Sequence, residues 1–432
     1  MHSQWNLITI LANFGEQIFI AHQKTEPTMK TNECDRRQFL KTSLLGGTGA
    51  ILASSSLIQT GCATAKASAL SGGVIRRKLG NTGIELPVVS FGVMRADNPA
   101  LIPAAIKAGL VHFDTAHGYQ RGRNEEMLGE VFKDYARDSY VVATKVPPEE
   151  MDGRSGTIKS GSTSKAFLDR LDISLKRLKL DYVDILYVHG ITSRDAALYP
   201  SMLEAVTQAK KDGKARHVGM STHKNEPEVI QAAIDSGVYE VVLSAINFKQ
   251  DYYPELKKTI AKAAKAGIGI VAMKTMAGGF HDRERQEPIN CKAALKFVLQ
   301  DENVTTAIPG MTNFDQLAMN ASVNTDTTMN EQEKADVAPG KNVGSLYCQG
   351  CEHCVSGCPK ALPIPEIMRA YMYTYGYRNV EMAHSLLSSL NLPANPCGEC
   401  SECTAQCVKG FRVDERIADV SRVLNVPTEF LT

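Results

Sequence analysis

The sequence predicts an α/β protein, a (β/α)8 TIM barrel followed by a small, mainly helical C-terminal domain. Two observations support this prediction. From Val88 to about Ala321, short β-branched segments alternate with amphipathic segments, and eight of the 11 cysteines lie between Cys348 and Cys407. With 432 residues, of which 43% are hydrophobic, the chain can form several domains and bury a large core. We expect an N-terminal signal segment over residues 1–70, the barrel over 71–335 and the cysteine-bearing domain over 340–432.

Eight segments are the predicted strands: Val88–Val93, Val111–Thr115, Tyr140–Val146, Val183–Val188, Arg216–Ser221, Val241–Ile246, Ile268–Met273 and Thr305–Ile308. The helices expected between them include Glu125–Tyr135, Lys165–Leu178, Met202–Lys211, Glu255–Lys265 and Cys291–Gln300. Eight such units in about 240 residues favour a closed barrel over an open sheet. Gly80–Gly83 predicts a hairpin turn that plugs the bottom of the barrel. No Gly-x-Gly-x-x-Gly follows an early strand, so the sequence does not support a Rossmann site.

The N-terminal residues resemble an export signal. Asp35–Lys41 contains Arg36-Arg37 and resembles a twin-arginine signal, and a weakly apolar stretch follows it. Ala63–Ala65 is a candidate cleavage site. Ile58–Cys62 is a competing lipoprotein box, although Gln59 stands where such boxes have a Leu-like residue. We therefore expect a bacterial protein, exported to the periplasm by the twin-arginine machinery, with a membrane attachment only if Cys62 is lipidated.

Two further expectations concern this N-terminal segment and the whole chain. Met29-Lys30 would open a normal signal, so we expect translation to start at Met29; the alternative for residues 1–60 is two ordinary helices. The net charge of +1 gives no electrostatic reason to expect nucleic-acid binding. No internal apolar run is long enough to predict a transmembrane span.

Four polar residues are predicted to meet at one rim of the barrel, where active sites of this fold lie. Asp114, Lys145 and His189 end three successive strands, and Tyr119 follows the first of them in a loop. A free phenol has a pKa of about 10, and a neighbouring ammonium lowers it. The carboxylate would hold the lysine, and the histidine could hydrogen-bond a substrate oxygen. Taken singly, Asp114 could instead be a turn cap, Lys145 a solvated strand end and His189 a core histidine.

Motifs around these residues resemble the aldo-keto reductase family, from about Val74 to Val323. They are Asp114-Thr115-Ala116 with Tyr119, Asn124-Glu125-Glu126, Leu128-Gly129, Lys145, Ser174–Leu178, Asp181–Asp184 with His189, the hairpin Leu79–Gly83 and Ile308-Pro309-Gly310. The resemblance implies hydride transfer between NAD(P)H and a small carbonyl or alcohol substrate. It assigns Tyr119 as the general acid, Lys145 and Asp114 as the groups that tune it, and His189 as the group that orients the carbonyl.

The same resemblance suggests cofactor contacts, with departures from the family pattern. The candidates are Ser221, Thr222, Asn247, Lys274, Gly310, Thr312, Gln316 and Asn320. Thr222 stands where the family often has Asn, and Leu243 where it often has Gln. The strand that ends at Met273 lacks the aromatic residue that often stacks on the nicotinamide. The segment from Gly310 to Asn320 contains no Arg or Lys, so the choice between NADH and NADPH stays open.

The cysteines form two runs with ferredoxin spacing. Cys348-x2-Cys351-x2-Cys354-x3-Cys358 is followed by a second run of the same spacing, Cys397, Cys400, Cys403 and Cys407. In proteins with two clusters the fourth cysteine of each run binds the other [4Fe–4S] cluster. One cluster is thus predicted on Cys348, Cys351, Cys354 and Cys407, and the second on Cys397, Cys400, Cys403 and Cys358. Structural zinc and disulfides are the alternatives, and the spacing fits both less well.

Two predicted helices, Pro365–Gly376 and Val380–Leu390, separate the runs. This arrangement resembles a helical dicluster ferredoxin, a module that follows some aldo-keto reductase barrels. The tyrosines of Tyr371–Tyr377 are expected to pack around the clusters. Carbonyl reduction needs no cluster, so we expect either an electron relay to an external electron-transfer partner or a structural role. The competing hypothesis is a non-catalytic electron-transfer or scaffolding iron–sulfur protein on a degenerate barrel.

Overall fold

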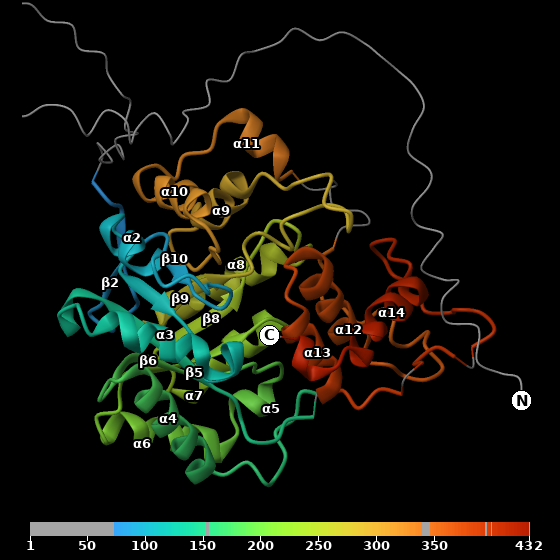
Figure 1. Cartoon of the computed structure of the whole chain (residues 1–432), viewed down its shortest axis with the longest axis horizontal. Coiled ribbons are helices and arrows are strands. Elements are labelled where there is room, and N and C mark those ends of the chain that lie inside the picture. Colours follow the sequence, from blue (N-terminus) through green and yellow to red (C-terminus); the bar gives the residue numbers. More distant parts are fainter. Residues whose placement is uncertain (1–72, 153–154, 339–345, 394, 399, 432) are drawn as a thin grey trace, which may run out of the picture. The chain divides into compact units, whose positions relative to one another are not determined.

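In a computed structural model of the protein, eight parallel strands follow one another in chain order and close into a barrel (Figure 1). The model describes residues 73–152, 155–338, 346–393, 395–398 and 400–431. The parallel strands in this part of the chain are β3 (Phe91–Gly92), β4 (His112–Asp114), β5 (Val141–Val146), β6 (Val183–Val188), β7 (Ala215–Thr222), β8 (Val241–Ala245), β9 (Gly269–Met273) and β10 (Val304–Ala307). Parallel bridges Val89–Ala307 and Gly92–Gly310 join the first strand to the last. The predicted (β/α)8 barrel is confirmed.

An antiparallel hairpin of β1 (Arg76–Lys78) and β2 (Glu85–Pro87) precedes the barrel. Its side chains Leu79 and Leu86 are fully buried in the same apolar cluster as inward-facing residues such as Ile185. Gly80, in the turn, has a φ of +52°, and a Cβ there would lie 2.3 Å from the carbonyl oxygen of Gly267. The hairpin therefore closes the end of the barrel opposite the carboxyl ends of the strands, as predicted.

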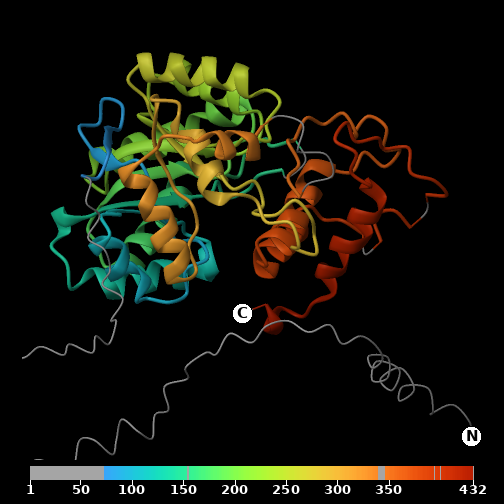
Figure 2. The same ribbon diagram turned by 90° about the horizontal axis from the view of Figure 1, so that it is seen from above.

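Helices cover the outer faces of the strands (Figures 1 and 2). They are α2 (Leu101–Lys107), α3 (Arg123–Phe132), α4 (Ser164–Leu178), α6 (Pro200–Lys211), α7 (Glu226–Ser236), α8 (Tyr253–Lys265), α9 (Cys291–Leu299) and α10 (Phe314–Ser322). Two short helices, α5 (Arg194–Ala197) and α11 (Glu331–Asp336), pack on α7 and α9, respectively. Side-chain caps fix several starts: Thr163 accepts a hydrogen bond from the Ala166 amide at α4, and Asn313 from the Gln316 amide at α10.

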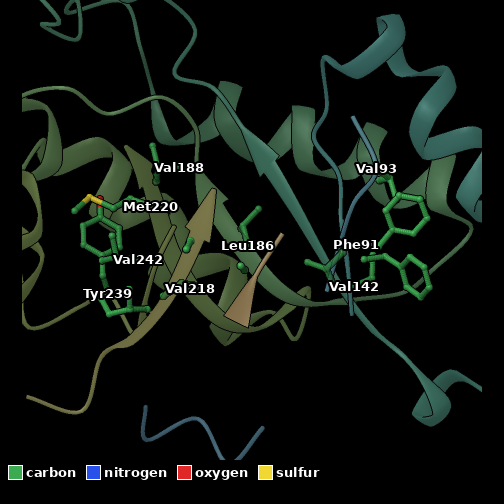
Figure 3. Close-up of a cluster of buried hydrophobic side chains, with 14 of the residues drawn as sticks. Phe91, Val93, Val142, Leu186, Val188, Val218, Met220, Tyr239 and Val242 are labelled. Carbon is green, nitrogen blue, oxygen red and sulfur yellow. The ribbon is translucent and has the colours of Figure 1, made fainter. Parts of the chain in front are cut away.

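The main core lies between the strands and these helices. The β-branched and aliphatic strand residues point alternately into the barrel and outward, so both faces are apolar and buried. The six residues of β6 are all buried. Figure 3 shows part of the outer core, in which the labelled side chains are Phe91, Val93, Val142, Leu186, Val188, Val218, Met220, Tyr239 and Val242.

The C-terminal region, defined here as described residues 346–431, is mainly helical. It contains α12 (Ile364–Tyr371), a π-helical turn (Met372–Gly376), α13 (Val380–Ser389) and α14 (Val413–Ser421). The first two predicted helices are confirmed, and α14 was not predicted. The apolar core of this region includes Ile367 and Leu387, and it also takes in the barrel residues Phe248, Ala277 and Ile289. The described residues fall into one compact unit, so the boundary expected at residues 335–340 stays a prediction.

The predictions for the N-terminus lie outside the described residues. They concern Met29, Arg36-Arg37, the cleavage site at Ala63–Ala65 and Cys62. Over the described ranges, no helix combines the length and the apolar character that crossing a membrane requires.

Candidate active site

The ammonium group of Lys145 is the centre of the site at the carboxyl ends of the strands. Its Nζ forms an ion pair with Asp114 Oδ1 and donates to the Thr115 carbonyl oxygen at 2.7 Å. The same Nζ lies 3.2 Å from the hydroxyl oxygen of Tyr119. Lys145 and Asp114 are at most 2% exposed. Three of the four side chains predicted to meet at this rim, those of Asp114, Tyr119 and Lys145, therefore do meet, and all three are buried.

The loop after β4 places Tyr119. Tyr119 begins a 3₁₀ turn in which Gln120 and Arg121 have φ values of 49° and 55°. Residues other than glycine rarely adopt such values. Gln120 Nε2 supports this turn by donating to the carbonyl oxygens of Met94 and Ala96, both at 3.2 Å. Strained backbone of this kind is typical of functional sites, where surrounding contacts hold it in place.

His189 faces the phenol ring from the end of β6. The two ring centroids are 5.9 Å apart, with the planes nearly perpendicular. Burial, together with the positive charges of Lys145, Arg369 and Lys274, lowers the pKa of His189 to about 3. The imidazole is therefore neutral at physiological pH and can donate a single hydrogen bond to a substrate oxygen.

Burial and charge act in opposite directions on the other groups. Burial raises the pKa of Tyr119 and outweighs the lowering by Lys145, so the phenol stays protonated at neutral pH. Burial also raises the pKa of Asp114, against the effect of Lys145. Burial alone would lower the pKa of Lys145, but Asp114 and Tyr119 together raise it. The expected lowering of the phenol pKa by the ammonium is thus present, and burial exceeds it.

The proposed nicotinamide side of the site is lined by polar groups at the ends of β7, β8 and β9. Ser221 is buried, and its Oγ accepts a hydrogen bond from the Gly190 amide at 3.0 Å. The Thr222 hydroxyl donates a hydrogen bond to the Lys224 carbonyl oxygen at 2.9 Å. Asn247 lies past the end of β8, where its Oδ1 accepts from the Lys249 amide at 3.0 Å. Asn247 thus closes a turn after the strand.

The segment before α10 forms the other half of the expected cofactor site. Gln316 Oε1 accepts from the amide and the hydroxyl of Thr312, at 2.7 and 3.1 Å. Gly310 is exposed, and Asn320 is buried with an Oδ1 that has no hydrogen-bond partner in the described residues. The amides of Thr312 and Gln316 are thus bonded within the segment, and the N-terminus of α10 contributes the positive end of a helix dipole, which favours a phosphate.

A third group of residues, which the sequence did not indicate, reaches the site from the C-terminal region. Arg369 on α12 contacts the His223 ring after β7, with Nη1 2.6 Å from Nδ1, and forms an ion pair with Glu366. Tyr373, in the π-helical turn, lies under the Lys274 ammonium, 5.4 Å from its ring centroid. The sequence could have indicated this contact through Glu366 and Arg369, a charged pair three residues apart within an otherwise apolar helix.

The tyrosines between Tyr371 and Tyr377 divide into two sets. Tyr371 and Tyr375 lie 4.4 Å apart, centroid to centroid, and Arg416 stacks on the Tyr371 ring within the C-terminal region. Tyr373 and Tyr377 form the other pair, and the Lys274 contact of Tyr373 turns this pair toward the barrel. The first set also contacts the barrel, because the Arg283 guanidinium lies 5.2 Å from the Tyr375 ring centroid. The expectation that these tyrosines pack around the clusters stays a prediction.

The predicted cysteine sets are also brought together. Burial raises the pKa of Cys348, and Cys351, Cys354 and Cys407 lie close enough to raise it further. In the second set, burial raises the pKa of Cys397, and the nearby Cys400, Cys403 and Cys358 raise it further. The nine cysteines in the described residues are all free of disulfides. Within these residues no three or more His, Cys, Asp or Glu side chains are arranged as a site for a metal ion.

Comparisons with known proteins agree with the barrel geometry. Residues 91–293 match the model of the aldo/keto reductase family. The uncharacterized oxidoreductase YqkF of Bacillus subtilis is 27% identical over 293 residues, which cover 60% of this chain and 94% of the relative. L-Galactose dehydrogenase of Arabidopsis thaliana is 27% identical over 298 residues, which cover 58% of this chain and 88% of the relative.

A solved structure shows the same fold. Aldo-keto reductase AKR11C1 from Bacillus halodurans, in its holo form, superposes with a TM-score of 0.51 at 22% identity, over 64% of this chain and 99% of that one. The family match, the near-complete coverage of the relatives and the closed barrel identify the same part of the sequence. The barrel-forming part of this chain is therefore a member of the aldo/keto reductase family of oxidoreductases.

Proposed function

We propose that the barrel reduces a small carbonyl compound with a hydride from NAD(P)H, or oxidises the corresponding alcohol. The observation that carries the proposal is the position of Lys145 Nζ between Asp114 and the Tyr119 hydroxyl oxygen. A buried phenol that stays protonated and touches an ammonium is suited to deliver a proton to a carbonyl oxygen. The alternative of a degenerate, non-catalytic barrel does not account for this intact arrangement.

The side chains act together on the carbonyl group. When bound, the nicotinamide supplies a hydride, which carries both electrons to the carbonyl carbon. His189, neutral and perpendicular to the Tyr119 ring, orients the carbonyl oxygen with one hydrogen bond. Tyr119 gives its proton to that oxygen, and the resulting phenolate is stabilised by Lys145. Asp114 keeps the ammonium charged and in place, so the site returns to its initial state after one proton is taken up.

The residues at the rim fit a dinucleotide. The exposed Gly310 and the start of α10 lie on the phosphate side, and the unpartnered Oδ1 of Asn320 would accept from a hydroxyl or amino group of the nucleoside. Ser221 and Lys274 would lie on the nicotinamide side. Relatives named L-galactose dehydrogenase and L-glyceraldehyde 3-phosphate reductase support a small carbonyl or alcohol substrate.

Substitution of Tyr119 tests the proposed activity. Tyr119→Phe removes the proton donor and should lower kcat for aldehyde reduction by about 10²- to 10⁴-fold. The matched control is Tyr239→Phe, because the Tyr239 hydroxyl is also buried but donates to the Ala197 carbonyl oxygen, away from the site. Oxidation of NADPH followed at 340 nm with both variants measures the effect. Equal turnover by wild type and Tyr119→Phe would favour the non-catalytic alternative.

We further propose that the C-terminal region holds two [4Fe–4S] clusters. One pocket is lined by Cys358, Cys397, Cys400 and Cys403, the set predicted for the second cluster. A single ion needs its ligands to converge to about 2.3 Å from one point, whereas the four thiolates of a cubane each bind a different iron and stay apart. Such a set is compatible with the lack of a convergent metal-ion site among the described residues.

Backbone amides support the first set. The Gly350 amide donates to Cys348 Sγ and the Lys409 amide to Cys407 Sγ, both at 3.4 Å. Hydrogen bonds of this type to cluster sulfurs are among the features that set the potential of a cluster. Cys348 also lines a pocket with His223 and Lys274 at the rim of the barrel. A cluster there would adjoin the active site, a placement compatible with a relay to an external electron-transfer partner and with a structural role.

Iron analysis and EPR of anaerobically purified protein test the clusters. Wild type should contain about eight irons per chain, and Cys348→Ser or Cys397→Ser should each remove one of two clusters. Cys291→Ser is the control, because Cys291 lies at the start of α9 outside both sets. Cluster signals that appear on adding NADPH would support a relay. Protein that is folded but free of iron would refute the assignment.

We also propose that the protein is exported with its cofactors already bound. The twin-arginine route carries folded proteins, which suits cofactors that are loaded before export. Replacing Arg36-Arg37 by Lys-Lys should retain the protein in the cytoplasm, as cell fractionation would show. Denaturing the mature protein should release a nicotinamide nucleotide, and mature protein that is folded but nucleotide-free would contradict pre-loading.

A further inference from the structure

We infer that Arg369 from the C-terminal region, together with Lys274, forms an anion-binding subsite of the active site, and that the preferred carbonyl substrate carries a carboxylate. The inference rests on the proposed carbonyl reduction and adds the class of substrate. It assigns to the C-terminal region a part in substrate selection, in a pocket that Cys348 also lines.

Helix α12 brings the guanidinium group to the rim of the barrel. Arg369 Nη1 lies 2.6 Å from Nδ1 of His223, which directly follows β7, although the two residues are 146 positions apart in the chain. Arg369, Lys274 and His223 line one pocket, in which Glu366 also takes part. Burial and the neighbouring cations lower the pKa of His223 well below its usual value, so its ring is neutral and accepts the hydrogen bond from Arg369.

Two cationic groups of this pocket keep unused hydrogen-bonding capacity. Glu366 pairs with Nη2 of Arg369 and His223 takes Nη1, but the buried Nε has no hydrogen-bond partner in the described residues. Lys274 forms no ion pair with a carboxylate in the same part of the chain, and its ammonium lies over the Tyr373 ring. A buried donor without a partner is costly unless a ligand or water satisfies it. A carboxylate would accept from Arg369 Nε and compensate the charge of Lys274.

Electrostatic interactions connect the subsite with the reacting groups. Three positive charges help to lower the pKa of His189, and they belong to Lys145, Arg369 and Lys274. Tyr373 is close enough to Tyr119 to affect the phenol. A carbonyl oxygen between Tyr119 and His189 therefore lies within electrostatic reach of the subsite. The unpartnered Nε of Arg369 and the Lys274 ammonium favour a substrate that carries a carboxylate over a neutral one of the same shape.

A substrate pair that differs only in charge tests the inference. We would compare 4-oxobutanoate with its methyl ester, measuring kcat and KM with saturating NADPH and cluster-loaded protein. Wild type should prefer the acid in kcat/KM by about 10-fold or more, since a charge-assisted hydrogen bond contributes at this level. Arg369→Met should remove most of this preference, mainly through the KM of the acid. Arg369→Lys keeps the charge and should restore part of it.

The control is Arg283→Gln. Arg283 also joins the barrel to the C-terminal region, through an ion pair with Asp419 on α14, but it lies outside this pocket. Its substitution should leave the ratio of acid to ester unchanged. Titration of 4-hydroxybutanoate into the protein by calorimetry gives a readout without turnover, and Arg369→Met should weaken binding by about 10-fold.

The outcomes separate this inference from the proposed function. An equal loss for acid and ester in Arg369→Met would show a structural role and overturn the inference, while leaving carbonyl reduction intact. A rise only in the KM for NADPH would assign the anion site to the pyrophosphate of the dinucleotide and overturn it as well. If wild type reduced neither aldehyde and did not bind 4-hydroxybutanoate, the inference would fail. Failure of the proposed function is recognised separately, by unchanged turnover in Tyr119→Phe.

Discussion

Glu226 gives a prediction in which the effect of a substitution depends on pH. This residue begins α7, is fully buried, and accepts hydrogen bonds from the Tyr252 hydroxyl at 2.8 Å and from Gln250 Nε2 at 3.4 Å. Burial raises the pKa of Glu226 from 4.5 to about 7. Glu226→Gln keeps the size and the acceptor oxygen and removes the ability to ionise, so it should stabilise the protein at alkaline pH.

The magnitude follows from the two pKa values. Below pH 4.5 the carboxyl is protonated in the folded and unfolded chains and contributes nothing to the pH dependence. As the pH rises from 4.5 to about 7 the unfolded chain loses its proton first, so the free energy of unfolding falls. The difference between about 7 and 4.5, at about 1.4 kcal/mol for each pKa unit, makes a cost of about 3 kcal/mol above pH 7.

Thermal unfolding of wild type and Glu226→Gln at pH 5 and pH 8.5 measures this effect. The variant should match wild type within about 1 °C at pH 5 and exceed it by roughly 5 °C at pH 8.5. Glu333→Gln is the matched control with the opposite sign, because buried Glu333 lies 3.2 Å from the Lys296 ammonium and its neutralisation removes an ion pair. A Glu226→Gln variant that is destabilised equally at both pH values would refute the reasoning.

Three further predictions concern the barrel. Lys145→Met leaves Asp114 buried without its cation and should lower the free energy of unfolding by about 3–5 kcal/mol in urea titrations; an unchanged midpoint would contradict the buried ion pair. The kcat/KM for carbonyl reduction should show no inflection near pH 6.5 and should fall only in the alkaline range, because the pKa of His189 is about 3 and that of Tyr119 is raised. Gly80→Ala should lower Tm by several degrees in calorimetry, since its Cβ would meet the Gly267 carbonyl, whereas Gly83→Ala, with open space around it, should cost roughly 1 kcal/mol.

Much of the barrel could be predicted because its strands are apolar on both faces. The predicted limits of β6, Val183–Val188, match the structure. The first predicted strand, Val88–Val93, pairs with β4 only at Phe91–Gly92, and Val89 and Gly92 form single bridges to the segment of the last strand where the barrel closes. A segment that joins two ends of a sheet carries the same apolar pattern as a regular strand, so composition alone does not separate them.

The proposed catalytic set was predictable because Asp114, Lys145 and His189 lie at strand ends and Tyr119 follows in the next loop, whereas the residues from the C-terminal region were not. Arg369 reaches His223 only through the packing of α12 on the barrel, and no local spacing encodes a contact between such distant segments. Helix α14 was missed for a local reason. Its nine residues have no side-chain cap at Arg412, and the apolar residues are interleaved with charged ones.

The core shared between the barrel and the C-terminal region limits how substrates can enter and leave. Phe248 and Ile289 from barrel loops are buried together with Ile367 and Leu387. Swinging the whole region away would return these side chains to water, at about 1.5–3 kcal/mol for each large residue. Such an open state would be too rare to support rapid turnover, so traffic through the site must depend on smaller movements of individual loops. The part of the C-terminal region that carries Arg369 and Tyr373 would then stay packed on the barrel during turnover, where it could select molecules by shape and charge.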